Sequence, residues 1–140
     1  MNELFDRLVG GWTLISARHE FDNGEVADMY GPLPVGSIVF TGQGRMMAIL
    51  TSSARTPESP SHELFQSMMS YTGRFKLIDA ELITIVDAAW IPNWVGSQQR
   101  RYATIDGDEL SIRTDRHNDH PLYLGKWVVG LIVWRKDIPD

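Results

Sequence analysis

The sequence predicts an all-β fold: an eight-stranded antiparallel up-and-down barrel with one short helix between the third and fourth strands. Segments with strand-like composition recur along the chain, and turn-forming residues close them. Most connections are short, which suits consecutive antiparallel strands, and closing the sheet on itself removes its free edges. A sandwich of two sheets is the alternative, but few long crossovers are visible. We therefore expect residues 1–140 to form one barrel domain.

Turn residues mark the ends of the predicted strands. Asp22-Asn23-Gly24 ends the first strand, and Asp106-Gly107-Asp108 has a pattern close to the Asp-Gly turn that hairpins favour. Between strands three and four, SHELFQSMMS (residues 61–70) spaces its apolar residues as a helix does, and a helical turn is expected at residues 2–8. The expected strands cover residues 12–21, 37–41, 45–51, 72–78, 82–90, 97–105, 109–114 and 126–135.

The composition excludes several classes of partner and site. The formal net charge of -5 argues against a nucleic-acid surface, which needs clustered Lys and Arg. The longest apolar run, residues 127–134, is too short to cross a bilayer, so no membrane partner is expected. The acidic N-terminus does not resemble a signal peptide. The absence of cysteine excludes disulfides and thiolate metal sites and suits a cytoplasmic protein, although export stays open.

Motifs for cofactors and metals are missing as well. No glycine-rich phosphate loop follows a strand, and there is no Gly-x-Ser-x-Gly elbow or paired-carboxylate motif, so we expect no cofactor. His117-x-x-His120 has a spacing that metals sometimes use, but it lies in a polar loop with no evident third ligand. We interpret it as a solvated loop and predict no metal site.

A series of motifs carries a family resemblance. The first strand opens on Gly10-Gly11-Trp12, a Gly-x-Trp triplet. Four further motifs follow in order: Gly44-Arg45-Met46-x-Ala48, Tyr71-Thr72-Gly73-Arg74-Phe75, Trp90-x-Pro92-x-Trp94-Val95-Gly96-x-x-Gln99-x-Arg101 and Asp106-Gly107-Asp108-x-Leu110. Together they resemble the bacterial and fungal lipocalin-like domain family over nearly the whole chain. Residues 114–124 fit that pattern least well.

The resemblance implies a small calyx-type barrel and leaves the activity open. Some lipocalin-like proteins carry hydrophobic small molecules and others act as isomerases or cyclases, so the fold alone does not choose between them. It also implies one structural pair. The Trp of the Gly-x-Trp triplet, here Trp12, plugs the barrel floor, and an arginine of the last strand, here Arg135, stacks on it.

The strand at 97–105 supplies the polar candidates for a site. Strand alternation places Gln99 and Arg101 on one face with Ala103 and Ile105, and we take this face as the inward one because it ends apolar. A hairpin centred near Trp94 would place Asp87 opposite Arg101 and form an interior ion pair. Alternatively, Arg101 anchors an anion or carbonyl of a ligand, with Gln99 beside it. Both readings stay open.

Several other side chains are candidates for contact with a ligand, with packing or exposure as the competing interpretation. His19 alternates opposite to Trp12, so a regular strand would point it outward; a bulge would reverse this and make His19 a candidate base or haem ligand. The polar or amphipathic candidates are Arg74 and Tyr71, and the apolar ones are Phe40, Met47, Trp90 and Trp94.

These observations favour a barrel that binds a small, hydrophobic or aromatic molecule through a mainly apolar cavity and a polar anchor of Arg101 and Gln99. One alternative is a cofactor-free isomerase, cyclase or lyase, in which Asp87 or His19 moves a proton while Arg101 stabilises negative charge. Another is a homodimer or interaction module that uses the exposed side of the strand at 127–134.

Overall fold

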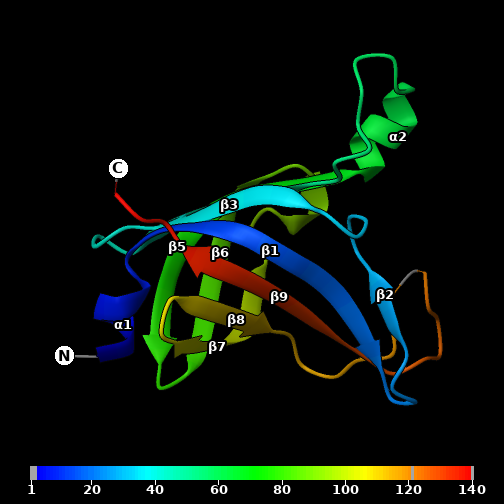
Figure 1. Ribbon diagram of the computed structural model, residues 1–140. Helices are drawn as coiled ribbons and strands as arrows, with labels where there is room; N and C mark the ends of the chain where they lie inside the picture. Colours follow the sequence, from blue (N-terminus) through cyan, green and yellow to red (C-terminus); the bar gives the residue numbers. More distant parts are fainter. Residues whose placement is uncertain (1–2, 121, 140) are drawn as a thin grey trace.

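A computed structural model describes residues 3–120 and 122–139, and its elements follow the predicted order (Figure 1). The elements are α1 (Glu3–Leu8), β1 (Gly10–Phe21), β2 (Val26–Asp28), β3 (Val35–Phe40), β4 (Arg45–Thr51), α2 (Ser61–Gln66), β5 (Met68–Ile78), β6 (Glu81–Ala89), the 3-10 turn η1 (Pro92–Trp94), β7 (Gln98–Asp106), β8 (Glu109–Arg113) and β9 (Val128–Lys136).

The predicted barrel is confirmed. The strands form one sheet in the order β2-β1-β3-β4-β5-β6-β7-β8-β9, and β1 also pairs with β9. This pairing closes β1 and β3 to β9 into an eight-stranded antiparallel barrel, and the short β2 adds to β1 outside the closure. The predicted helix at 61–70 is shorter than expected, because Met68 and Met69 already pair with β4. No described helix has the length and hydropathy needed to cross a bilayer.

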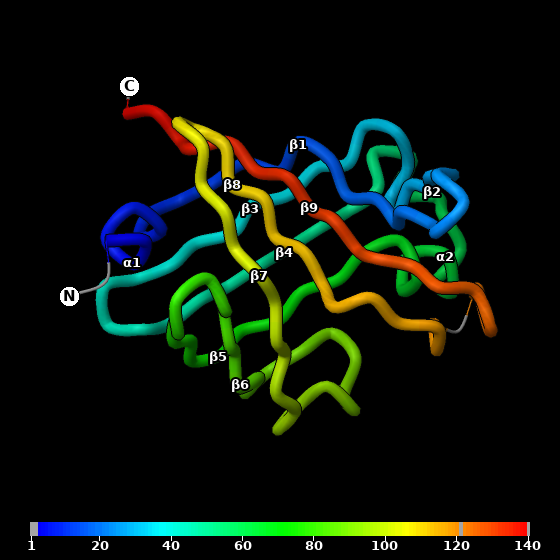
Figure 2. The backbone as a smooth tube through the Cα atoms, turned by 90° about the horizontal axis from the view of Figure 1, so that it is seen from below, coloured from blue at the N-terminus to red at the C-terminus, as the bar shows by residue number. Residues whose placement is uncertain are grey.

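The two ends of the barrel differ in what lies across them. Helix α1 lies at one end, whereas β2 and α2 lie at the other (Figures 1 and 2). At the α1 end, Phe5 stacks on Phe75 with ring centroids 5.6 Å apart, and Phe40 meets the same ring edge-on at 5.1 Å. Phe40 is therefore buried in this aromatic cluster, which favours the packing interpretation, and its contact with a ligand stays a prediction.

Trp12 is part of the same core, but its predicted partner is wrong. The indole is 1% exposed and donates from Nε1 to the carbonyl of Leu8 at 2.9 Å. Lys136, which pairs with Trp12 in the β1–β9 ladder, places its ammonium 4.7 Å from the centre of the indole ring. Arg135 pairs with Thr13 instead and is exposed. Adjacent residues of a strand face opposite ways, so a difference of one position moved the cation to the other face.

A β-bulge in β1 decides where His19 points. The pairing with β9 shifts between Leu14 and Ser16, which leaves Ile15 as the extra, exposed residue. The alternation therefore reverses: Trp12 is inward before the bulge, and His19 is inward after it, with only 9% of its surface exposed. A regular strand was the wrong expectation, and the bulged alternative is what the structure has.

A second bulge, between β5 and β6, places Gly73 close to neighbouring backbone. Gly73 is buried, and a Cβ on it would lie 2.3 Å from the carbonyl oxygen of Ile85 and 2.7 Å from Cγ2 of Thr84. We expect Gly73→Ala to lower the free energy of unfolding in urea by about 3 kcal/mol, since neither obstacle is the end of a flexible side chain. Gly42→Ala is the matched control, because its Cβ would meet nothing within 4 Å. Equal stabilities of the two variants would contradict this account of the bulge.

Candidate functional site

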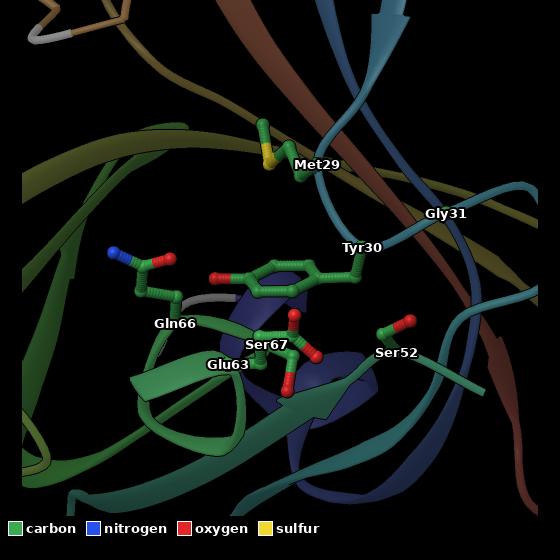
Figure 3. Close-up of a pocket in the computed structure, with 7 residues that line it drawn as sticks. All are labelled: Met29, Tyr30, Gly31, Ser52, Glu63, Gln66 and Ser67. Carbon is green, nitrogen blue, oxygen red and sulfur yellow. The ribbon is translucent and has the colours of Figure 1, made fainter. Parts of the chain in front are cut away.

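A pocket of about 300 Å³ opens at the end of the barrel where α2 lies. In Figure 3 the ring of Tyr30 lies across this pocket, with its hydroxyl toward the side chain of Gln66. The walls come from the loop after β2, the residue after β4, and helix α2 with the residue that follows it, and none of the lining residues was among the predicted site residues. The lining residues are Met29, Tyr30, Gly31, Ser52, Glu63, Gln66 and Ser67.

Tyr30 connects this pocket to the interior of the barrel. Its phenol interacts electrostatically with that of Tyr71, which pairs with Ala48 and Ala89 on the inward faces of β4 and β6. The ring of Tyr71 meets Trp94 edge-on, with centroids 5.4 Å apart. Burial raises the pKa of Tyr30 to about 12, and burial also raises the pKa of Tyr71. Both phenols therefore stay protonated at neutral pH and can donate hydrogen bonds.

Arg101 and Gln99 face inward from β7, as their alternation predicted. They pair with Leu82 and Thr84, which are buried. The Arg101 guanidinium donates at 2.8 Å to Oε1 of Gln99 and at 2.8 Å to its neighbour's carbonyl. Gln99 in turn donates from Nε2 to Oγ of Ser97 at 3.0 Å. This chain of hydrogen bonds holds the guanidinium by its own strand and leaves it without an opposing charge.

The neighbouring Arg100 has a different environment from Arg101. Arg100 points to the outer face, where it pairs with Glu81 at 2.9 Å and donates to the Tyr102 hydroxyl at 2.8 Å. Arg101 forms no ion pair with any carboxylate in the described part of the chain. Its positive charge does act on Tyr71, where it partly offsets the rise in the phenol's pKa. Arg101 is therefore an inward-facing cation that no carboxylate of the described residues balances.

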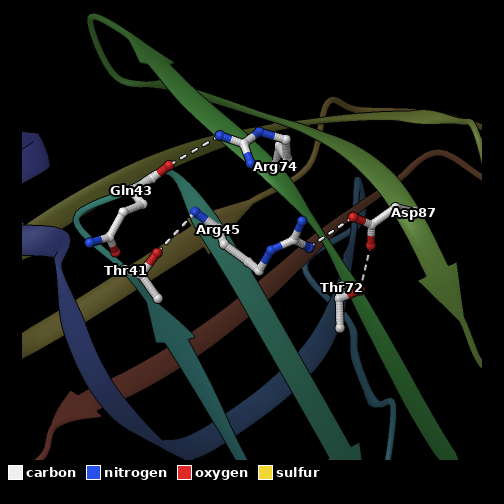
Figure 4. Close-up of polar contacts among 6 residues, drawn as sticks. All are labelled: Thr41, Gln43, Arg45, Thr72, Arg74 and Asp87. Carbon is white, nitrogen blue, oxygen red and sulfur yellow. Dashed lines mark hydrogen bonds and ion pairs between the residues drawn. The ribbon is translucent and has the colours of Figure 1, made fainter.

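The predicted ion pair between Asp87 and Arg101 does not form. The β6–β7 ladder places Leu82, not Asp87, opposite Arg101. Asp87 is the extra residue of the β5–β6 bulge and lies on the outer face, where Arg45 donates to it at 2.8 Å and Thr72 at 2.5 Å (Figure 4). The hydrogen bond from Thr72 and then that from Arg45 lower the pKa of this carboxyl. Asp87 is therefore an exposed carboxylate and not an interior base.

Three more candidates lie away from the interior. Met47 is 55% exposed on the outer face of β4, so the expectation that it lines a cavity is wrong. Arg74 is exposed and donates to the carbonyl of Gln43 at 3.2 Å (Figure 4). Trp90 stacks on Phe65 with centroids 5.4 Å apart and donates to its carbonyl at 2.9 Å. Trp90 thus fastens α2 to the end of β6.

His19 lies in an aromatic cluster that the sequence did not predict. Its ring meets those of His120 and Tyr123 edge-on, with centroids 4.5 Å and 5.3 Å away, so part of the polar loop covers it. Its Nδ1 is buried without a hydrogen-bond partner in the described residues. Burial, with smaller contributions from His120 and His117, lowers the pKa of His19 to about 4. Within the described residues, no three His, Cys, Asp or Glu side chains are arranged to hold a metal ion.

Comparison with known families agrees with this architecture. The family described as "Lipocalin-like domain" matches residues 9–137. The chain belongs to this lipocalin-like domain family. The match includes both the packed core around Trp12 and the inward face of β7, and it leaves the ligand and any activity undetermined.

Individual relatives add nothing more specific to this lipocalin-like protein. No curated protein matches it. A lipocalin-like protein from Bacteroides uniformis ATCC 8492 aligns with a TM-score of 0.48 and 15% identity, over 93% of this chain and 98% of that one. An uncharacterized protein from Bacteroides eggerthii DSM 20697 aligns with a TM-score of 0.47 and 14% identity, over 93% of this chain and 99% of that one.

Proposed function

We propose that this lipocalin-like barrel binds a small, mainly apolar molecule at its α2 end, with Arg101 and Gln99 as the polar anchor. The observation that carries the proposal is the inward guanidinium of Arg101, which has no acidic partner in the described residues. The pocket of about 300 Å³ that Tyr30 lines is at the lower end of the range for small-molecule sites. Tyr30, Tyr71 and Trp94 supply the aromatic surface such a molecule would contact.

We favour binding over catalysis because neither candidate base, Asp87 or His19, is suited to take up a proton inside the barrel near neutral pH. The enzyme alternative requires a group that takes up a proton near neutral pH, and Asp87 lies on the outer face. His19 does point inward, but a pKa of about 4 makes its imidazole a weak base under those conditions. The same proposal places the protein in the cytoplasm as one domain, and homodimer formation through β9 stays a prediction.

The proposal is tested with Prodan, a neutral fluorescent naphthalene whose single ketone can accept hydrogen bonds. We expect the parent protein to bind it, and Arg101→Ala to weaken binding by about tenfold, the usual loss for a hydrogen bond from a charged group. Arg100→Ala is the matched control, because that arginine lies one residue away on the outer face.

Circular dichroism of each variant separates binding from folding in this experiment. A folded Arg101→Ala protein that binds Prodan as well as Arg100→Ala does would refute Arg101 as the anchor. An unfolded Arg101→Ala protein would instead show that the guanidinium is required by the barrel itself.

A further inference from the structure

The polar groups around Arg101 in the proposed site are mostly hydrogen-bond donors, whereas the α2 end of the site also holds the Glu63 carboxylate and the Gln66 amide oxygen, which accept. The hydroxyls of Tyr30 and Tyr71 have no hydrogen-bond partner in the described residues, and both remain protonated at neutral pH. Arg101 can only donate. The carbonyl oxygen of Gln99 is an acceptor, but Arg101 already occupies it at 2.8 Å. Near Arg101 and Tyr71, a bound molecule therefore meets donors that need an acceptor.

The charge of the site points in the same direction. Five of the described arginines, Arg18, Arg45, Arg100, Arg113 and Arg116, pair with a carboxylate. Arg7, Arg55, Arg74 and Arg135 form no such pair with the described residues, so Arg101 is distinguished by its inward position on β7 together with the missing partner. Arg101 is the inward-facing guanidinium, and no carboxylate of the described residues balances it. A half-buried charge without a partner is costly, and a bound anion would remove that cost.

Resting on the proposed function, we infer that the ligand is an apolar, aromatic or aliphatic, carboxylic acid bound as its monoanion, with Arg101 as counter-ion and Tyr71 as a further donor. A planar guanidinium matches a carboxylate with two parallel hydrogen bonds, which a single carbonyl cannot use. One cation balances one negative charge, so a monoanion fits better than a phosphate dianion.

The position of the other charged group gives the ligand an orientation. Glu63 lines the pocket beside α2, so a carboxylate at that end would be repelled. The carboxylate therefore points toward Arg101 and Tyr71, while the apolar body extends past Tyr30 and Met29 toward α2. Tyr30, at the boundary between the two regions, contacts the body with its ring and can donate from its hydroxyl.

The test compares 6-dimethylamino-2-naphthoic acid with its methyl ester, which has the same fluorophore and no charge. At neutral pH we expect the parent protein to bind the acid about tenfold more tightly than the ester, as a charge-assisted pair predicts. Arg101→Gln should abolish this preference and leave ester binding nearly unchanged, because the glutamine amide can still donate to a carbonyl but carries no charge. Tyr71→Phe should reduce the preference by about threefold, the value of one hydrogen bond.

The outcomes separate this inference from the proposed function. If the ester binds as tightly as the acid, the anion is wrong while the small-molecule site stands. If neither compound nor Prodan binds, both proposals fail. If Arg101→Gln does not fold, Arg101→Lys replaces it in the test. Lysine keeps the positive charge but lacks the planar pair of donors, so this variant should retain only part of the preference for the acid over the ester. Arg100→Gln controls for anions held at the surface, and a matching loss in that variant would overturn the inference.

Discussion

Replacing Trp12 with alanine should lower the free energy of unfolding by about 4 kcal/mol, the middle of the range for a large aromatic residue removed from a core. The side chain is 1% exposed and belongs to the cluster that fills the α1 end of the barrel. Its removal also leaves the carbonyl of Leu8 without the donor that now lies 2.9 Å away. Because domains of this size are stable by only about 5–15 kcal/mol, urea denaturation should show a marginally folded variant.

The adjacent pair Lys136 and Arg135 provides the control for this account of the core. Lys136→Met removes the ammonium 4.7 Å from the indole centre and the bond from Nζ to the carbonyl of Val9 at 2.8 Å. We expect it to cost about 1 kcal/mol, whereas Arg135→Met on the exposed face should change stability by less than about 0.5 kcal/mol. A larger loss in Arg135→Met would show that the stacking cation has been assigned to the wrong residue.

Features that depend on local alternation could be predicted from the sequence. Turn residues bounded the strands, and a period of two placed Gln99 and Arg101 on the same inward face as Ala103. Neither prediction depends on which residue of the neighbouring strand lies opposite. The short β2 was not predicted, because three residues are too few to show alternation.

Features that depend on register could not be predicted in the same way. The prediction of Asp87 opposite Arg101 assumed a hairpin symmetrical about Trp94. In the structure the 3-10 turn η1 lies in an asymmetrical loop, and Ser97 accepts a backbone hydrogen bond from Val86 at 3.0 Å. The extra residue of a bulge reversed the side of His19 as well. An error of one residue in either place sends a side chain to the opposite face.

Tyr30 was missed for a different reason. It lies in a loop between β2 and β3, where no periodic pattern exists to indicate which way a side chain points. The contact of His120 and Tyr123 with His19 joins a loop to a strand about a hundred residues away in the chain. The only signal in the sequence was the spacing of His117-x-x-His120, which was interpreted as a solvated loop and does not point to His19 as a neighbour.

Acidification should destabilise the protein through His19, and His19→Leu should remove much of that loss. The folded protein holds the pKa of this imidazole at about 4, against an ordinary value of 6.5, first because it is buried and then because His120 and His117 lie near it. Between these two values the unfolded chain binds a proton that the folded protein does not. The free energy of unfolding is therefore fully retained above about pH 6.5, falls as the pH decreases toward about 4, and levels off for this group below that.

The full lowering of the His19 pKa would correspond to a loss of about 3 kcal/mol in the free energy of unfolding. Because water can reach the ring beside the loop, we expect a loss of about 2 kcal/mol. Urea denaturation of the parent and of His19→Leu, repeated at several pH values across this window, measures the difference directly. Removing the imidazole also removes the buried Nδ1 that lacks a partner among the described residues, so the variant should fold normally at neutral pH.

His62→Gln, at the exposed start of α2, removes one histidine without touching the cluster and should keep the pH dependence of the parent. If His19→Leu loses stability with acid as steeply as His62→Gln does, the proton uptake that accompanies unfolding belongs to other groups.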